Sequence, residues 1–463
     1  MEPSKFNVYI PLIDEEYLLF NSISKAIIRL EAQIFQSFLK GELNYWDPLT
    51  LRLISDHFYV DNSDKQYESL KSHDYAEKKS GNFHHLTIML SEACNFSCDY
   101  CNQGSSKESL KISPDLFRQI ENYVLSKANE NSIVDISWFG GEPLLHSELL
   151  ITESKRLKSI LSSKNIKYKS RVLTNGFLLS DTLAIRLKEA SVNGAQVSFD
   201  GYIDDHNSSR YVRKGIDTYN IILSNLYDVL NNVDDFAISL RINVTAKNID
   251  GLESLIYDLT SRGFGQFQNF NVYWGHVYDP TKSKIPDAIN IDELLLSHEK
   301  FAEAELKLNR LLRRADINAS KTINLTQGNC LATQSSSLLI KPNGDLHKCY
   351  IPVSNEAYSV GNLEDYGSIK DNEIFNRWDS WTAFNESNCS GCRLLGSCRG
   401  GCPIKYIMDD YNQESYQCPP NKLRVNEHLF DLAKQLGIVS DENWCESTSA
   451  TKLEKLRMSC SIE

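Results

Sequence analysis

The sequence predicts an α/β fold whose largest part is a parallel sheet or partial barrel, and three observations support this prediction. Apolar runs typical of buried strands recur after residue 84. Segments with helical periodicity separate these runs, and such alternation is typical of parallel sheets with helical crossovers. The chain has 463 residues, which is too long for one ordinary domain, so further units are expected on either side of this part.

The predicted strands and helices follow one another in regular order. The apolar runs expected to form strands are 86–90, 133–139, 170–173, 195–199, 237–244 and 270–274. The helical patterns between them are 114–127, 147–161, 182–190, 219–230 and 252–260. Ser113 and Pro114 form a good helix start, with a capping oxygen followed by proline at the first helical position. In folds of this kind the loops after the strands carry the chemistry.

Different patterns flank this central part. Before it, short strands at 6–10 and 17–20 and helices at 31–39 and 48–58 predict a small α+β module over residues 1–80. The polar stretch 61–83 is interpreted as a linker. The remaining predicted units are a barrel over 84–290, a helical bridge over 291–325, a cysteine-rich domain over 326–425 and a C-terminal helix and tail over 426–463. Within the last three units, helices are expected at 291–314 and 422–436.

Composition excludes several classes of function. The formal net charge of −12 would repel nucleic acid and acidic membranes, so neither is expected as a partner. No apolar run approaches the roughly 18 residues that a membrane span needs. Asp14, Glu15 and Glu16 interrupt the apolar N-terminus, which argues against a signal peptide. A cytoplasmic location is therefore expected, where thiols stay reduced.

The distribution of the 12 cysteines points to metal ligands. Three lie at 94–101 and seven between 330 and 418, whereas Cys445 and Cys460 stand apart. In a reducing compartment, clustered cysteines are more often metal ligands than disulfides. Cys445 and Cys460 are predicted to be plain thiols.

The first cluster of cysteines forms the motif Cys94-x3-Cys98-x2-Cys101, just after the first predicted strand. Three thiolates in one loop can bind three irons of a cubane and leave the fourth iron open to a small molecule. Zinc is the alternative, but it usually takes four protein ligands or includes histidine, and no histidine follows closely here. The aromatic Tyr100 before the last cysteine also favours a cluster.

This loop resembles the signature of the radical S-adenosylmethionine (SAM) superfamily. The resemblance implies a partial (β/α)6 barrel of the TIM type, with Cys94, Cys98 and Cys101 as ligands of a catalytic [4Fe–4S] cluster. It also implies that the open iron binds the amino and carboxylate groups of SAM. An electron from a low-potential donor such as flavodoxin or ferredoxin then cleaves SAM to a 5′-deoxyadenosyl radical, which abstracts a hydrogen atom.

Further residues at the ends of successive strands are implied to contact SAM. They are Tyr100, Gly140, Gly141, Glu142, Pro143, Thr174, Asn175, Ser198, Asp200, Arg210 and Arg241. Glu142 can accept hydrogen bonds from an ammonium group, and its alternative is a surface glutamate in a tight turn. Arg241 and Asn243 are two residues apart in a strand and therefore share one face. Arg241 is expected either to meet the SAM carboxylate or to form a structural salt bridge.

The seven later cysteines resemble the SPASM extension of radical SAM peptide-modifying enzymes. This implies two auxiliary [4Fe–4S] clusters, three clusters in all. The outer cluster would be held by Cys389, Cys392, Cys398 and Cys418. The inner cluster would be held by Cys330, Cys349 and Cys402, and since 331–338 contains no cysteine, only three thiolates are expected there. A zinc-binding domain is the alternative.

The resemblance implies a precursor peptide with a leader segment as the substrate and an intramolecular crosslink (C–C, ether or thioether) as the product. Formylglycine formation of the anaerobic sulfatase type is an alternative, but its catalytic aspartate is replaced here by Tyr350, directly after Cys349. Peptide epimerisation is another alternative; it would need a hydrogen-donor cysteine, for which Cys445 and Cys460 are the candidates. A non-catalytic iron–sulfur or zinc scaffold is the alternative from a different class. Residues 1–80 are expected to recognise the leader or to cap the barrel.

Overall fold

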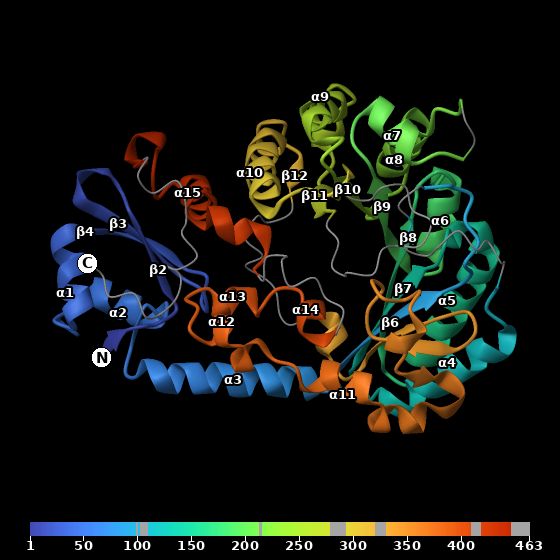
Figure 1. Ribbon diagram of the computed structural model, residues 1–463, viewed down its shortest axis with the longest axis horizontal. Coiled ribbons are helices and arrows are strands. Elements are labelled where there is room, and N and C mark those ends of the chain that lie inside the picture. Colours follow the sequence, from blue (N-terminus) through green and yellow to red (C-terminus); the bar gives the residue numbers. More distant parts are fainter. Residues whose placement is uncertain are drawn as a thin grey trace.

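The largest sheet of the protein has ten strands, in the order β12-β11-β10-β9-β8-β7-β6-β13-β14-β15. Figure 1 labels its strands from β6 to β12. The computed structural model describes residues 1–98, 101, 110–212, 215–277, 293–319, 330–408 and 418–445. The parallel strands that follow chain order are β6 (Phe83–Met89), β7 (Ile133–Phe139), β8 (Lys167–Thr174), β9 (Val192–Phe199), β10 (Ala237–Val244) and β11 (Phe270–His276). The predicted α/β fold with an open, partial barrel is confirmed.

Short strands lengthen this sheet at both edges. At one edge β12 (Asn318–Ala319) runs parallel to β11. At the other, β13 (Ser337–Ile340) pairs in parallel with β6, and β14 (Asp345–His347) and β15 (Gly361–Asn362) continue antiparallel. The cysteine-rich part of the chain thus begins as a continuation of the barrel sheet.

Helices cover the outer face of the parallel strands. They are α4 (Pro114–Lys127), α5 (Ser147–Ser162), α6 (Asp181–Glu189), α7 (Ile203–Ser209), α8 (Thr218–Asn232) and α9 (Leu252–Ser261). The Ser113 hydroxyl accepts the N–H of Leu116 at 3.1 Å, as a capping residue should. Apolar side chains from these helices and from the facing side of the strands make the largest core, with Trp138 fully buried in it. Because side chains alternate along a strand, the other face is left to line the barrel interior.

The N-terminal module contains three strands more than the two that the sequence predicts. Its antiparallel sheet is β2 (Asn7–Pro11), β3 (Glu16–Asn21) and β4 (Ile27–Glu31), packed with α1 (Ala32–Lys40) and α2 (Pro48–Ser55). The short β1 (Glu2–Pro3) pairs with β5 (Tyr59–Val60). The segment that forms β4 is short, and its burial alternates only over its last residues, so its period is hard to recognise.

The predicted linker at 61–83 is wrong, because most of it forms helix α3 (Ser63–Lys79). The Asn62 side chain caps this helix by accepting the N–H of Lys65 at 2.7 Å. Its buried positions include Asp74 and Lys78, which are charged, so the helix carries little apolar periodicity. The helix runs along one side of the molecule from the N-terminal module toward the barrel (Figure 1).

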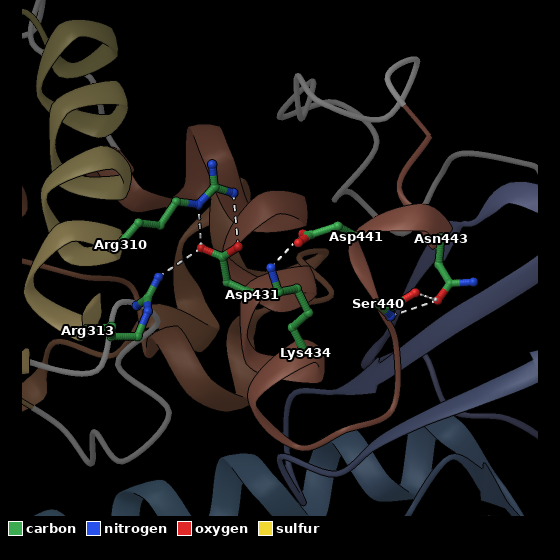
Figure 2. Close-up of polar contacts among 7 residues, drawn as sticks. All are labelled: Arg310, Arg313, Asp431, Lys434, Ser440, Asp441 and Asn443. Atoms are coloured by element: carbon green, nitrogen blue, oxygen red, sulfur yellow. Dashed lines mark hydrogen bonds and ion pairs between the residues drawn. The ribbon is translucent and has the colours of Figure 1, made fainter. Parts of the chain in front are cut away.

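After the barrel, α10 (His298–Arg314) begins later than the predicted position 291, because Ser297 caps it; residues 291–292 lie outside the described part. The cysteine-rich region contains α11 (Glu373–Ser380), α12 (Ser387–Ser390), α13 (Leu395–Cys398) and α14 (Ile404–Ile407). The C-terminal helix α15 (Val425–Gln435) follows. Figure 2 shows Asp431 of α15 accepting from Arg310 at 2.8 and 3.0 Å and from Arg313 at 2.9 Å, which joins α15 to α10.

Short 3₁₀ helices complete the described secondary structure. They are Ile13–Glu15, Pro143–His146, Ile249–Gly251, Phe264–Gln266, Leu331–Thr333, Glu356–Tyr358, Leu363–Asp371, Ala383–Asn385, Pro420–Arg424 and Asp441–Asn443. The first residues of the C-terminal helix predicted at 422–436 therefore belong to a 3₁₀ turn. Among the described residues, no helix is both long enough and apolar enough to cross a membrane.

Candidate functional site

The loop after β6 carries the first three cysteines. Cys94 and Cys98 are half-buried and Cys101 is exposed. The backbone N–H of Phe96 points at the Cys94 sulfur at 3.3 Å, and the Phe96 ring packs edge-on against Phe177 at 5.8 Å. These contacts fix the first half of the loop. Tyr100 lies outside the described residues.

The glycines after β7 are required by the cysteine loop itself. A Cβ atom on Gly140 would lie 2.3 Å from the Ser91 carbonyl oxygen, and one on Gly141 would lie 2.4 Å from that of Ala93. Gly141 N donates to Ser91 O, and the next residue, Glu142, donates its N–H to Ala93 O, each at 2.9 Å. Gly140 also has a φ of +138°, a value that L side chains rarely adopt. The loop after β7 therefore lies directly against the backbone that leads to Cys94.

Glu142 is buried and joins the ends of two strands. Its carboxylate is 1% exposed, so the alternative of a surface glutamate is wrong. It accepts the Thr174 hydroxyl and the Asn175 N–H at 2.7 Å each, and the Leu144 N–H at 2.9 Å. Burial raises the pKa of Glu142, and these hydrogen bonds oppose the rise. Pro143, which is also buried, begins the 3₁₀ helix that follows.

A second polar network lies at the ends of β9 and β10. Asp200 accepts from Asn243 Nδ2 at 2.9 Å, and its Oδ1 lies 3.8 Å from Nη1 of Arg210. The Arg210 guanidinium is 9% exposed and sits over the ring of Phe96 at 5.8 Å. Burial raises the pKa of Cys98 to about 12, and the charge of Arg210 opposes that rise. Arg210 is therefore a buried cation beside the cysteine loop.

Arg241 and Asn243 lie on one face of β10. A Cβ on Gly275 would stand 2.8 Å from Arg241 Nε and 3.2 Å from Asn243 Oδ1. Within the described parts of the chain, Arg241 forms no ion pair, so the structural salt bridge considered for it is not found there. Arg241 pairs in register with Ser198 of β9, which is half-buried. The Arg241 charge lowers the pKa of Tyr350 against the larger effect of burial, which raises it.

The later cysteines fall into two groups in space. Burial raises the pKa of Cys330 to about 11 and raises that of Cys349, and in both cases a neighbouring Cys402 thiol adds to the rise. The second group surrounds Lys422, whose Nζ lies 3.5 Å from the Cys392 sulfur. Its members are Cys389, Cys392, Cys398 and Cys418. These are the two sets that the resemblance implied.

A large cavity connects the barrel interior with these cysteines. Its volume is about 1110 Å³. Thr87, Phe139 and Leu173 line it from β6, β7 and β8. The C-terminal region contributes Cys330, Cys349, Tyr350, Cys398 and Cys402. Tyr350 is 48% exposed and is one of the residues that line the cavity.

The barrel interior also holds a cluster of three charged or titratable residues that the sequence did not predict. His85 Nδ1 lies 3.0 Å from an Asp135 carboxylate oxygen, and Arg171 Nη2 donates to the same oxygen at 3.0 Å. Burial favours the neutral form of Asp135, but the hydrogen bond from His85 and the charge of Arg171 prevail and lower its pKa. His85 and Arg171 line the cavity. Two of them, His85 and Asp135, could have been found from the sequence, because each is a polar residue within a strand that is otherwise largely apolar.

The thiol groups suit a cluster of several irons. Among the residues that the structure describes, no three Cys, His, Asp or Glu side chains converge as ligands of one metal ion would. Arg210 beside the first group and Lys422 within the last supply positive charge next to thiols that must be deprotonated to bind iron.

Comparison with known proteins agrees with this geometry. Residues 88–246 match the Radical SAM superfamily model. The radical SAM cyclopropyl synthase TigE of Paramaledivibacter caminithermalis is 24% identical over 444 residues, covering 86% of this chain and 89% of TigE. The serine-type anaerobic sulfatase-maturating enzyme of Klebsiella aerogenes is 22% identical over 340 residues, covering 69% of this chain and 80% of that enzyme.

Two solved structures share the fold. The sulfatase-maturating enzyme anSMEcpe with bound AdoMet and Cp18Cys peptide has a TM-score of 0.57 at 17% identity, covering 76% of this chain and 97% of anSMEcpe. Streptococcus suis SuiB bound to precursor peptide SuiA has a TM-score of 0.50 at 17% identity, covering 91% of this chain and 100% of SuiB. A radical SAM domain implies an enzyme that uses SAM and a [4Fe–4S] cluster. Residues 88–246 therefore form a radical SAM domain, and the chain as a whole resembles the peptide maturases of the superfamily.

Proposed function

We propose that this enzyme crosslinks a ribosomally made precursor peptide within the cavity. The observation that carries the proposal is the continuity of this space, which runs from the barrel strands to Cys330, Cys349 and Cys402. A peptide residue held there would lie between the radical-generating end of the barrel and the inner auxiliary cysteines. The neighbours crystallised with peptides, anSMEcpe and SuiB, support a peptide substrate.

The first three cysteines would hold the SAM cluster, which supplies a 5′-deoxyadenosyl radical when SAM is bound. The chain's own residues hold that end of the barrel in place. Glu142 joins the ends of β7 and β8, and Gly140 and Gly141 let the β7 loop support the cysteine loop. Arg210 places a buried positive charge beside the thiols. We assign the SAM contacts to the strand ends that carry Thr174, Asn175, Ser198, Asp200 and Arg241.

A crosslink removes two hydrogen atoms from the peptide. One leaves as a hydrogen atom to the 5′-deoxyadenosyl radical, and the other leaves as a proton and an electron when the new bond forms. Two auxiliary [4Fe–4S] clusters, held by the inner and outer cysteine sets, would accept the electron. His85, which is oriented by Asp135 and lines the cavity, would take the proton at its imidazole.

The described residues favour a crosslink over the alternatives. Tyr350 lines the cavity where a sulfatase-type maturase would need a carboxylate base. Cys445, one of two candidate hydrogen donors for an epimerase, follows Trp444, which packs on Phe430 of α15. Cys445 is not among the residues that line the cavity, and Cys460 lies outside the described residues. TigE is named a cyclopropyl synthase, which supports formation of a C–C bond.

We also propose that residues 1–80 bind the leader segment by adding a strand at the β4 edge. The other edge strand, β2, is partly covered, because Arg393 donates to the Asn7 carbonyl at 3.1 Å. Asn21 N donates to Ala26 O across the β3–β4 turn, which marks a hydrogen-bonded pair. Hydrogen-bonded and non-hydrogen-bonded residue pairs alternate along an antiparallel ladder. Ile27 and Arg29 are therefore in non-hydrogen-bonded pairs with β3, and their backbone N–H and C=O groups point away from it.

The test uses reconstituted, reduced protein and the peptide encoded next to its gene. SAM should be cleaved to 5′-deoxyadenosine, and the peptide should lose two hydrogens without becoming reactive toward an aldehyde probe. Formylglycine made from serine would show the same mass loss but would react with the probe. Epimerisation would leave the mass unchanged. Intact clusters without SAM cleavage would exclude an enzyme and favour a peptide-binding scaffold.

A further inference from the structure

Lys422 is a buried lysine whose ammonium group points into the outer set of cysteines. It lies in the 3₁₀ helix Pro420–Arg424, is 6% exposed and contributes to the wall of the cavity. Its Nζ stands 3.5 Å from the Cys392 sulfur, a distance at which N–H can donate to sulfur. Electrostatic interactions reach the other three thiols of the set as well. Lys422 is therefore hydrogen-bonded to one sulfur and within electrostatic range of the other three.

Two other buried lysines of this region are held by oxygen atoms, although both also interact electrostatically with Cys330 of the inner set. Lys78 pairs with the Asp74 carboxylate at 3.2 Å. Lys348 donates to the backbone carbonyls of Gln334 and Ser337 at 2.6 and 2.7 Å.

The half-buried Lys405 interacts electrostatically with Cys389, Cys398 and Cys418 of the outer set, but no hydrogen bond to their sulfurs is found for it among the described residues. Across the described residues, Lys422 forms no ion pair with a carboxylate. Its negative partners there are the cysteine sulfurs.

A buried ammonium group without a counter-ion is costly, so its position is explained if the sulfurs carry negative charge. A [4Fe–4S] cluster with four thiolates is an anion, and it gains a further negative charge on reduction. Nearby positive charge and N–H···S hydrogen bonds favour the reduced form and raise the reduction potential. Lys422 exchanges no atom or electron in this role, and the cluster alone takes up the electron.

We propose that Lys422 is a positioning residue that raises the reduction potential of the outer auxiliary cluster and so draws toward it the electron removed from the peptide. This inference rests on the proposed function, because it requires a cluster at Cys389, Cys392, Cys398 and Cys418. It ties the reduction potential of the outer cluster to one side chain.

The test is a redox titration of the full chain followed by electron paramagnetic resonance. Alanine at Cys94, Cys98 and Cys101 leaves only the auxiliary signals, and Cys389→Ala identifies the outer one. In Lys422→Met the outer cluster should lose about tenfold in electron affinity, equivalent to about 59 mV for a one-electron couple, while the inner cluster is unchanged. Lys422→Arg keeps the charge and should shift less. Lys434→Met is the control, because Lys434 pairs with Asp441 at 2.5 Å (Figure 2) and should leave both potentials unchanged.

An unchanged potential in a Lys422→Met protein that retains its iron would overturn the inference and leave the proposed function standing. Absence of any Cys389-dependent signal in the parent protein would instead contradict the proposed outer cluster. If Lys422→Met loses the outer cluster, Lys422→Gln is titrated and should show the same lowering. If both neutral variants lose the outer cluster and Lys422→Arg keeps it, the positive charge is needed and the inference is supported. If Lys422→Arg loses the outer cluster as well, the inference is overturned.

Discussion

At the scale of single residues, Glu142 combines an expected contact with SAM and a structural role in the protein. Within the motif Gly140–Pro143 it is implied to contact SAM, but its carboxylate already accepts three hydrogen bonds within the protein. A buried donor that loses its acceptor keeps its desolvation penalty, which is why such a residue is costly to remove. The glycines beside it are explained by the approach of the cysteine loop, and the sequence alone gives no sign of that contact.

Glu142→Ala should lower the free energy of unfolding by about 2–4 kcal/mol, because the Thr174 hydroxyl and the N–H groups of Leu144 and Asn175 lose their acceptor. Thermal melting of the protein without SAM measures this effect. Glu148→Ala is the matched control, since Glu148 is 74% exposed and pairs with Arg186 at the surface. An equal melting temperature for both variants would contradict the structural role.

His428 predicts a pH dependence of stability. Its imidazole is 2% exposed, and burial lowers its pKa from 6.5 to about 4. Between these two pH values the unfolded chain binds a proton at His428 and the folded protein does not. The free energy of unfolding therefore falls as the pH drops from 6.5 toward 4, by up to about 3 kcal/mol. His428→Leu should remove this contribution. Its melting temperature should then fall less than that of the parent between pH 7.5 and 5.5, and parallel profiles would refute the assignment.

At the scale of elements, helix α3 shows why some of the fold escapes prediction. Its sequence is polar because two of its inward positions hold an ion pair in place of apolar side chains. Asp74 contacts Lys78 at 3.2 Å and Arg399 at 3.1 Å, and the Asp74 and Lys78 side chains are each 2% exposed. Pattern recognition depends on apolar periodicity, so a helix held by buried charges is mistaken for a linker. The barrel strands, with regular apolar runs, are all predicted in the right order; two match exactly, and β6, β8 and β9 begin three residues earlier than predicted.

Asp74→Ala should destabilise the protein by about 3–5 kcal/mol, because it leaves Lys78 and Arg399 buried without their counter-ion. Melting temperature and the rate of proteolysis within 61–83 report this loss. Asp64→Ala on the same helix removes an exposed charge, since the Asp64 side chain is 87% exposed, and should change stability by less than about 1 kcal/mol. A smaller effect at Asp74 than at Asp64 would argue against the buried network.

Strand β4 carries a prediction about leader binding. Arg29→Pro removes an outward N–H of the edge strand while the pairing of β4 with β3 is kept. The affinity for the full precursor should fall at least about tenfold, and peptide-independent SAM cleavage should stay unchanged. Arg29→Ala retains the N–H and is the control. Fluorescence anisotropy with a labelled leader measures both, and equal binding by the two variants would exclude the β4 edge.

At the scale of the whole molecule, the structure brings together cysteines that lie far apart in the chain. Spacing alone separates the loop at 94–101 from the later seven, and resemblance divides those seven into two sets. The structure places Cys330 with Cys402, and Cys392 with Lys422, although long stretches of chain separate them. The cavity that joins the barrel to the inner set could not be predicted, because it depends on the tertiary packing of both parts.

Three clusters predict about twelve irons per chain. Replacing Cys94, Cys98 and Cys101 together by alanine should leave about eight and abolish formation of 5′-deoxyadenosine. Cys445→Ala should change neither quantity, because Cys445 belongs to none of the three sets. Iron and sulfide analysis of anaerobically purified protein, with chromatography of the SAM products, gives both readouts. Retention of SAM cleavage in the triple variant would contradict the assignment of the catalytic cluster.

The pairing of β13 with β6 has a consequence for engineering. The cysteine-rich part shares a continuous hydrogen-bonded ladder with the barrel, from Ser337 opposite His85 to Ile340 opposite Ile88. A chimera that exchanges this part between relatives would have to cut through a sheet, and would expose a strand edge prone to aggregation. Swaps should therefore keep β13 and β14 with the barrel and join the chains beyond β15. The two functional halves of this enzyme are not interchangeable modules.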